Sequence, residues 1–201
     1  MNLAQAFSRL RRLEVPVFTT AEAAVALRGT TGAASKTLQR LRDADLVRSI
    51  RRGLWTLDFE LSPLVLPEYL TAPAASYVSL QTALHLHGMI EQIPSVVYAV
   101  TLSRTQRVQT NLATFSLHRI APSFFGGFEV VPRAGAKVAA PEKALLDVFY
   151  LSAGRSRLFS SLPEIELPAR FRVGEARAWV ERIPSPRVRT VVARRLDRYL
   201  T

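Results

Sequence analysis

Cysteine does not occur among the 201 residues, which excludes a disulfide framework, a thiolate metal site and a cysteine nucleophile. Long apolar runs are missing too, because no window approaches the roughly 18 residues that a membrane span needs. The amino terminus lacks the basic start and the apolar run of a signal peptide. We therefore expect a cytoplasmic protein with no membrane partner.

Histidine is scarce, and the familiar catalytic motifs are absent. The chain has three histidines. His85 and His87 stand two positions apart on a predicted helix, where they point to different faces and cannot share a metal ion. No HExxH, GxSxG or P-loop pattern occurs. These absences predict a protein that is not an enzyme and that holds no metal and no cofactor.

Two sets of charged residues have the composition of a partial catalytic site. Asp43 and Asp45 have the spacing of a nucleotidyltransferase carboxylate pair, but no Gly-Ser loop and strand precede them. Glu142, Lys143 and Asp147 could act as acid, cation and base. A helix start and a surface ion pair four residues apart explain these three more simply. A nuclease joined to a DNA-binding domain is the alternative that metal-dependent cleavage would support.

Lysine is rare beside arginine, which supplies 24 of the 27 basic side chains. A genome rich in G and C accounts for that preference, but it does not account for where the charges lie. Residues 1–57 and 170–201 each carry a net charge of +6, whereas residues 58–169 carry −1. Arginine can donate two hydrogen bonds to one phosphate. The distribution therefore favours contact with nucleic acid near both ends of the chain.

Residues 19–57 follow the order of a winged helix-turn-helix domain, which we place at 1–60. The predicted elements are helices over 2–13, 21–27 and 34–44 and strands over 46–50 and 54–57. Thr19 or Thr20 suits the start of the second helix as a cap, and Gly53 tolerates the positive φ of a hairpin turn. Residues 30–33 are the expected connection between the second and third helices.

The third helix is the predicted recognition helix, whose polar side would enter the major groove of DNA. Ala34, Leu38 and Leu41 share one face and should pack inward. The predicted DNA contacts are the polar side chains outside this face and the arginines of the hairpin: Ser35, Lys36, Gln39, Arg40, Arg48, Arg51 and Arg52. A solvated polar surface is the alternative interpretation of the helix considered alone.

Residues 61–201 are expected to form a second, mixed α+β domain with a small sheet, so the fold class of the chain is α+β. Three prolines between 58 and 73 mark the boundary. The predicted elements are helices over 76–87, 140–152, 173–183 and 185–200 and strands over 96–102, 113–120, 128–132 and 137–139.

The last helix carries a second basic surface, predicted to comprise Arg187, Arg189, Arg194 and Arg198. This surface could contact nucleic acid or an acidic protein partner, or it could simply be solvated. Arg195 falls within the apolar face of the same helix, so we expect its side chain to extend to solvent or to meet a buried acid.

Two motifs carry a resemblance to a known family. They are the stretch SLQTALHLHG (Ser79 to Gly88) and the stretch PEKALLD (Pro141 to Asp147). Together with the predicted winged helix and the strand VVYAVTLS, they make the chain similar to the AbiEi family of bacterial antitoxins over nearly its whole length.

The resemblance implies an antitoxin of a type IV toxin–antitoxin system, linked to abortive phage resistance. Its partner would be a nucleotidyltransferase-like toxin of the AbiEii type, encoded beside it. The amino-terminal domain would bind promoter repeats in double-stranded DNA and repress the operon, and the carboxy-terminal domain would oppose the toxin. A stand-alone winged-helix regulator, with a ligand- or partner-sensing second domain, is the alternative. The oligomeric state stays open between a monomer and a weak dimer.

Overall fold

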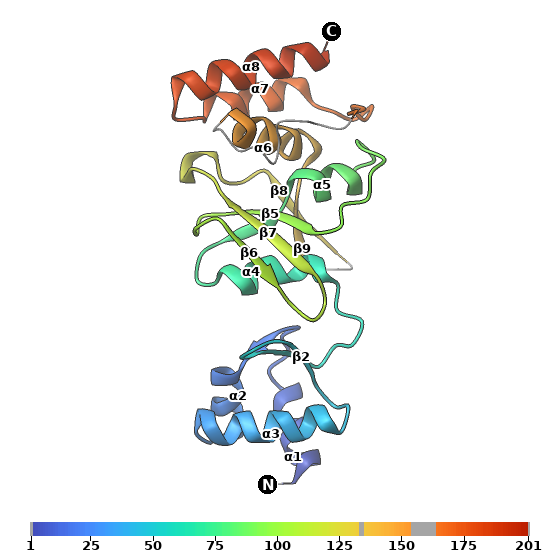
Figure 1. The fold of residues 1–201 in the computed structure, drawn as a ribbon, viewed down its shortest axis with the longest axis vertical. Helices are drawn as coiled ribbons and strands as arrows, with labels where there is room; N and C mark the ends of the chain where they lie inside the picture. Colours follow the sequence, from blue (N-terminus) through green and yellow to red (C-terminus); the bar gives the residue numbers. More distant parts are fainter. Residues whose placement is uncertain (1, 133–134, 154–163, 201) are drawn as a thin grey trace. The chain divides into compact units, whose positions relative to one another are not determined.

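The computed structural model describes residues 2–132, 135–153 and 164–200. The chain divides into two compact units, and its fold class is α+β, as predicted (Figure 1). The first unit comprises Met1–Pro63 with Gln109–Ala113, and the second comprises Leu64–Val108 with Thr114–Thr201.

The first unit contains three helices and a small antiparallel sheet of three strands in the order β1-β3-β2. Its elements are α1 (Leu3–Arg11), β1 (Phe18–Thr19), α2 (Thr20–Leu27), α3 (Thr31–Asp43), β2 (Arg48–Arg51) and β3 (Leu54–Thr56). The three helices enclose a core in which Leu10, Phe18 and Leu38 are almost completely buried. Trp55 of β3 donates a hydrogen bond from Nε1 to Oγ1 of Thr20 at 3.0 Å, which joins the hairpin to α2.

Threonine caps fix the starts of α2 and α3. Of the two predicted caps of α2, the structure selects Thr19, which forms a reciprocal capping box with Glu22. At α3 the prediction was wrong, because the helix begins at Thr31 and not at Ala34. Oγ1 of Thr30 accepts the Ala33 backbone N–H at 3.2 Å. This cap sets the start of the helix. Gly32 lies in the first turn, where the backbone N–H groups have no partner within the helix, so glycine lowers the stability of the helix little there.

The second unit contains a six-stranded sheet in the order β6-β7-β5-β4-β9-β8. Within it β4 runs parallel to β9 and β5 runs parallel to β7, whereas the β4–β5 and β8–β9 pairs are antiparallel. The strands are β4 (Ser76–Val78), β5 (Val97–Thr101), β6 (Gln106–Gln109), β7 (Thr114–Arg119), β8 (Phe128–Val131) and β9 (Ala136–Ala139).

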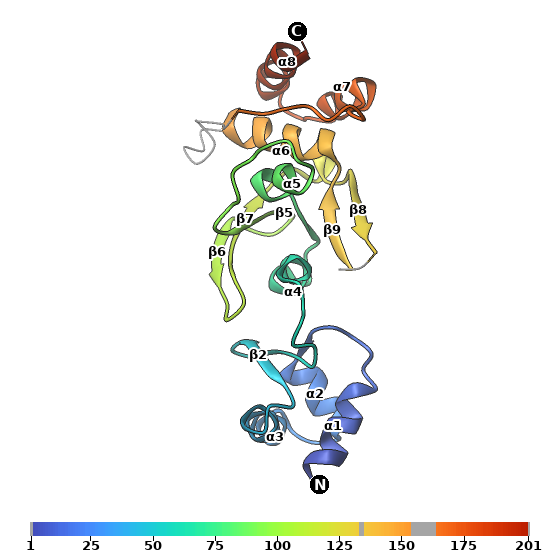
Figure 2. The ribbon, with the colours of Figure 1, turned by 90° about the vertical axis from the view of Figure 1, so that its right-hand side faces the viewer.

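Among the residues that the structure describes, five α-helices and two 3₁₀ turns accompany this sheet, and α6 forms a middle layer. The helices are α4 (Leu66–Thr71), α5 (Leu80–Leu86), α6 (Pro141–Ala153), α7 (Val173–Glu181) and α8 (Pro186–Leu200), and the turns are η1 (Pro63–Val65) and η2 (Pro122–Phe124). Figure 2 shows α6 between the sheet and the pair α7–α8, and α6 contacts α5, α7, α8 and β9.

Two predictions for this unit failed in informative ways. Residues 76–87 were expected to form one helix, but Ser76–Val78 form the central strand β4 and only Leu80–Leu86 are helical. Both flanks of β4 are paired, so the sheet's hydrogen bonds and the burial of Tyr77 override the apolar spacing that continues into α5. Strand β6 was missed because its sequence, QRVQ, is short and polar, as an edge strand allows.

Candidate nucleic-acid interface

Helix α3 presents a polar side to solvent and an apolar side to the core. Ala34, Leu38 and Leu41 are buried, as the spacing predicts. Lys36, Gln39 and Arg40 are exposed, and Ser35 is half-buried. Because these side chains project from one regular helix whose apolar side is anchored, their positions relative to one another are fixed by the helix.

The β2–β3 hairpin holds the remaining predicted contacts. Arg51 and Arg52 are exposed at its tip, where Gly53 adopts φ +81°. An L side chain at position 53 would be strained, so the turn depends on glycine. Arg48 lies further back and is half-buried, and its Nη1 donates to the Phe59 carbonyl oxygen at 3.4 Å. Arg48 therefore differs from the two arginines of the tip in having a contact within the protein.

A groove of about 650 Å³ lies between α3 and the hairpin. It brings together Ser35, Gln39 and Arg52 from the predicted set, whereas Lys36, Arg40, Arg48 and Arg51 do not line it. Its lining consists of Thr20, Thr31, Gly32, Ser35, Gln39, Arg42, Ser49, Arg52, Gly53 and Trp55. No carboxylate is among these residues, and the two charged side chains of the lining, Arg42 and Arg52, are both basic.

Arg42 lies on the polar side of the helix, as the spacing predicts, but it was left out of the predicted DNA contacts. It follows Ser35 and Gln39 at helical spacing, so the same periodicity could have added it to that set. Its guanidinium pairs with the Asp43 carboxylate at 2.8 Å, and both side chains are more than half exposed. An exposed pair of this kind is weak, so Arg42 can exchange Asp43 for a phosphate at little cost.

The second basic surface divides into two groups in the structure. Arg187, Arg194 and Arg198 are exposed on α8. Arg189 is instead half-buried, and its Nε and Nη2 donate to the Ile183 carbonyl oxygen at 3.1 and 2.8 Å. These two hydrogen bonds hold the Arg189 side chain against the turn that precedes α8. Arg195, expected to meet solvent or a buried acid, donates a hydrogen bond to the Ser152 hydroxyl.

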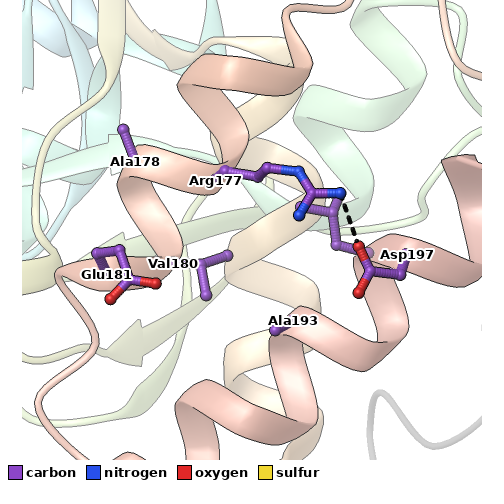
Figure 3. A pocket seen from close by; sticks show the side chains of 7 residues that line it. Arg177, Ala178, Val180, Glu181, Ala193 and Asp197 are labelled. Carbon is purple, nitrogen blue, oxygen red and sulfur yellow. Dashed lines mark hydrogen bonds and ion pairs between the residues drawn. The ribbon is translucent and has the colours of Figure 1, made fainter.

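A pocket of about 290 Å³ lies between α7 and α8 (Figure 3). Val180, Leu196 and two alanines line it, and Glu181 lies at its edge. The Arg177 guanidinium donates to the Asp197 carboxylate at 3.0 Å across one side. The volume falls at the small end of ligand sites, and no aromatic side chain is among the lining residues.

The three candidate catalytic residues of α6 are buried, and the expected surface pair between Lys143 and Asp147 is wrong. Both side chains are fully buried and form an ion pair inside the second unit. The Asp147 Oδ2 accepts hydrogen bonds from the Ser79 hydroxyl at 2.6 Å and the Tyr77 hydroxyl at 3.1 Å. Periodicity failed here because α6 is covered on several sides, so its polar positions have no route to solvent.

Aromatic rings complete the surroundings of Lys143. Its Nζ lies 3.8 Å from the centroid of the Phe124 ring and 5.3 Å from that of Trp179, within the range of cation–π attraction. Burial lowers the pKa of Lys143 and raises the pKa of Asp147, and the mutual attraction of the two groups opposes both shifts. A cluster sealed in this way cannot touch a substrate, so it holds the sheet to α6.

Glu142 and two of the three histidines, His87 and His118, make hydrogen bonds within the second unit. Glu142 is buried, and its Oε1 accepts the Arg172 backbone N–H at 2.6 Å. His87 bonds through Nε2 to the Ala139 carbonyl oxygen at 2.7 Å, and His118 bonds through Nε2 to the Ser116 hydroxyl at 2.8 Å. Over the described ranges, no cluster of three His, Asp or Glu side chains could hold a metal ion.

Comparison with known proteins leaves the family unassigned: no protein-family model matches the sequence, and no curated protein matches it. None of the helices in residues 2–132, 135–153 and 164–200 is long and apolar enough to cross a membrane.

Proposed function

We propose that the protein is a winged helix-turn-helix regulator that binds duplex DNA through its first unit. The observation that carries the proposal is the groove between α3 and the β2–β3 hairpin, which contains Gln39, Arg42 and Arg52 and no carboxylate. Helix, helix, recognition helix and hairpin follow one another in the order of that domain.

In this proposal α3 enters the major groove, and the hairpin follows the phosphate backbone. Gln39 can make a bidentate pair with adenine, and Lys36 or Arg40 can reach guanine or a phosphate. Arg51 and Arg52 at the hairpin tip contact phosphates, which positions α3 without reading sequence. The solvent exposure of Lys36, Gln39, Arg40 and the two tip arginines supports these assignments.

We further propose that the protein is the antitoxin of a type IV system and represses its own operon. The support is the resemblance of the motifs at Ser79–Gly88 and Pro141–Asp147 to the AbiEi family. The two motifs are joined by the hydrogen bond from Ser79 to Asp147 in the buried cluster. In this proposal the motifs therefore mark a shared scaffold, and opposition to the nucleotidyltransferase-like toxin comes from the exposed surface of the second unit.

Footprinting on the DNA upstream of the gene tests the regulatory proposal. We expect protection of repeated sequence elements, with an affinity that falls steeply as salt rises because bound phosphates release counterions. Equal protection of promoter DNA and of a scrambled duplex at every salt concentration would refute sequence-specific regulation.

Co-expression with the neighbouring gene tests the antitoxin proposal separately. The full chain should restore growth that the neighbour's product inhibits. A full-length variant carrying Arg40→Ala, Arg51→Ala and Arg52→Ala should restore growth equally while losing repression of a promoter reporter. If the wild-type chain represses the reporter but gives no rescue, the stand-alone regulator is the better account.

A further inference from the structure

Arg42 and Asp43 are neighbours at the end of α3, and their side chains are paired. Nε and Nη2 of Arg42 donate to one oxygen of Asp43, Oδ1, at 3.1 and 2.8 Å. A guanidinium carries five N–H donors in a planar fork. The pairing uses the side of the fork that includes Nε, and it leaves the Nη1–Nη2 end to donate to another acceptor. Arg42 can therefore contact a ligand without leaving Asp43.

Asp43 lies where an acid is unfavourable for two reasons. It is the last residue of α3, and the carboxyl end of a helix carries a partial negative charge that repels a carboxylate. Its partner Arg42 lines the groove that the proposed function assigns to DNA, whose phosphates would repel Asp43 as well. The contact with Arg42 is what explains an acid at this position, because that contact holds the guanidinium in one orientation.

Arg42 lies on the groove side of α3 together with Ser35 and Gln39. At 100° per residue the three positions fall within about 60° of one another, and Gln39 and Arg42 are about 4.5 Å apart along the helix axis. Successive base pairs are separated by a similar distance, about 3.4 Å. Gln39 and Arg42 can therefore reach base pairs that are close neighbours in one major groove.

The charge of the pair distinguishes a base contact from a phosphate contact. Exchange of Asp43 for a phosphate costs little in the free protein, but in a DNA complex it would leave the Asp43 carboxylate unpaired beside other phosphates. If Arg42 keeps Asp43, the pair has no net charge and attracts phosphates weakly. The edge of guanine is uncharged, and its two acceptors in the major groove, O6 and N7, suit the Nη1–Nη2 end of an arginine.

We propose that Arg42 reads a guanine in the major groove and that Asp43 is the positioning residue that orients it. Nη1 and Nη2 of Arg42 donate to O6 and N7 of the base, while Nε stays with Asp43. Because Gln39 can pair with adenine from the same side of α3, the bound sequence should contain a guanine close to an adenine. The inference rests on the proposed function, because it takes α3 to enter the major groove of DNA.

The test begins with the selection, from a randomised duplex library, of the sequences that the full chain binds most tightly. Affinity is then measured as a function of salt for the selected duplex and for every single-base substitution in it. Arg42→Ala is compared with Arg52→Ala, because Arg52 is the other arginine of the groove and is assigned to a phosphate. Thermal melting verifies that each variant folds.

A second comparison tests the positioning role, with Asp43→Ala set against Asp45→Asn. Asp45 is exposed just beyond the end of α3, so its replacement removes the same charge close to the same place. Asparagine is chosen there because position 45 has φ +53°, a conformation that asparagine tolerates.

Arg42→Ala should lose about tenfold or more of the preference for guanine at one position and keep the preferences at the others. Its slope of log K against log salt should change by less than about 0.5, because Arg42 makes no phosphate contact in this proposal. Arg52→Ala should weaken binding to all the duplexes alike and lower the slope by about 0.9.

Asp43→Ala should reduce the same guanine preference by about threefold or more, although it removes a negative charge beside DNA and so raises the affinity for duplexes that lack this guanine. Asp45→Asn should leave the preference unchanged. In a chain that already carries Arg42→Ala, Asp43→Ala should no longer affect the preference at that position, because the residue that it orients is gone.

The outcomes separate this inference from the proposed function. A uniform loss of affinity in Arg42→Ala, with the slope lowered by about 0.9, would assign Arg42 to a phosphate and overturn the inference, while the proposed function would stand. An intact guanine preference in Asp43→Ala would overturn the positioning role of Asp43. If the full chain enriches no sequence and binds every duplex equally, the proposed function is wrong, and the inference is wrong with it.

Discussion

Helices α3 and α6 have the same length, 13 residues each, yet the charged residues of α3 are exposed whereas those of α6 are buried. On α3 the basic side chains Lys36, Arg40 and Arg42 are exposed, and only three apolar residues are buried. On α6 every residue from Pro141 to Phe149 is buried, including the ion pair of Lys143 with Asp147. The difference follows from what covers each helix, because α6 lies between a sheet and two helices.

This difference separates charges that can bind a ligand from charges that hold the fold. An exposed arginine keeps its hydration until a phosphate replaces it, so its loss affects binding more than stability. A buried ion pair has already lost its hydration, so removal of one partner leaves the other without compensation. Charge-removing variants of the two helices should therefore have different consequences, and the following predictions test this in order of decreasing effect.

Asp147→Ala should have the largest effect on stability. It leaves the Lys143 ammonium buried and unpaired, and removing one partner of a buried pair costs about 3–5 kcal/mol. Asp43→Ala on α3 is the matched control, because Asp43 pairs with Arg42 on the surface and such pairs contribute about 0–1 kcal/mol. Urea denaturation of both variants measures the difference. Equal destabilisation would show that burial of the α6 pair has no energetic consequence.

A double variant sharpens this result. Lys143→Met with Asp147→Leu removes both charges together, and we expect it to be more stable than Asp147→Ala alone, because no uncompensated charge remains. A double variant as unstable as the single one would assign the loss to packing and to the hydrogen bonds of Tyr77 and Ser79.

Thr30→Ala should have an intermediate effect, confined to the first unit. It removes the cap at the start of α3, and a change of this kind costs about 1 kcal/mol. Thr37→Ala on the same helix is the control, since the hydroxyl of Thr37 bonds only to the preceding turn and alanine has the higher helix propensity. The free energy of unfolding, measured for each variant, should fall for the first and stay nearly level for the second.

The smallest effect should come from the protonation of His118. Burial lowers its pKa below the ordinary value of 6.5, so the unfolded chain binds the proton more readily than the folded one. Stability should therefore fall as the pH drops below about 6.5, where the unfolded side chain becomes protonated. His118→Gln should weaken this fall between pH 7.5 and 5.5 in denaturation experiments. An identical pH dependence of the two proteins would show that His118 does not contribute to the pH dependence of stability.

The sequence was most informative where a helix or strand has one side exposed. In α3 the buried positions Ala34, Leu38 and Leu41 follow from spacing alone, and in β7 Phe115 and Leu117 are buried as their alternation predicts. Caps were also readable, as Thr19 shows, although the same chemistry at Thr30 was mistaken for a connection.

The sequence was least informative where tertiary structure covers an element completely. Lys143 and Asp147 have the spacing of a surface pair, and only the layers packed around α6 bury them. The strand at Tyr77 depends on partners distant in the chain, Val100 in β5 among them. Such interactions leave no local periodicity, so a single sequence cannot reveal them. In contrast, helical spacing from Ser35 and Gln39 is enough to place Arg42 on the same side of α3.

The most direct test of the central claim is the affinity of the full chain for its own promoter, compared between two triple variants. The recognition variant carries Arg40→Ala, Arg51→Ala and Arg52→Ala. The control carries Arg104→Gln, Arg107→Gln and Arg119→Gln. Each variant removes three exposed arginines, from α3 and the hairpin in one case and from in or beside β6 and β7 in the other. We predict a loss of at least about 100-fold for the recognition variant, since it removes the contact of Arg40 with guanine or phosphate and the two phosphate contacts of the hairpin tip, and a change within about threefold for the control. Equal affinities of the two variants for promoter DNA would contradict the claim that α3 and the hairpin form the DNA-binding surface.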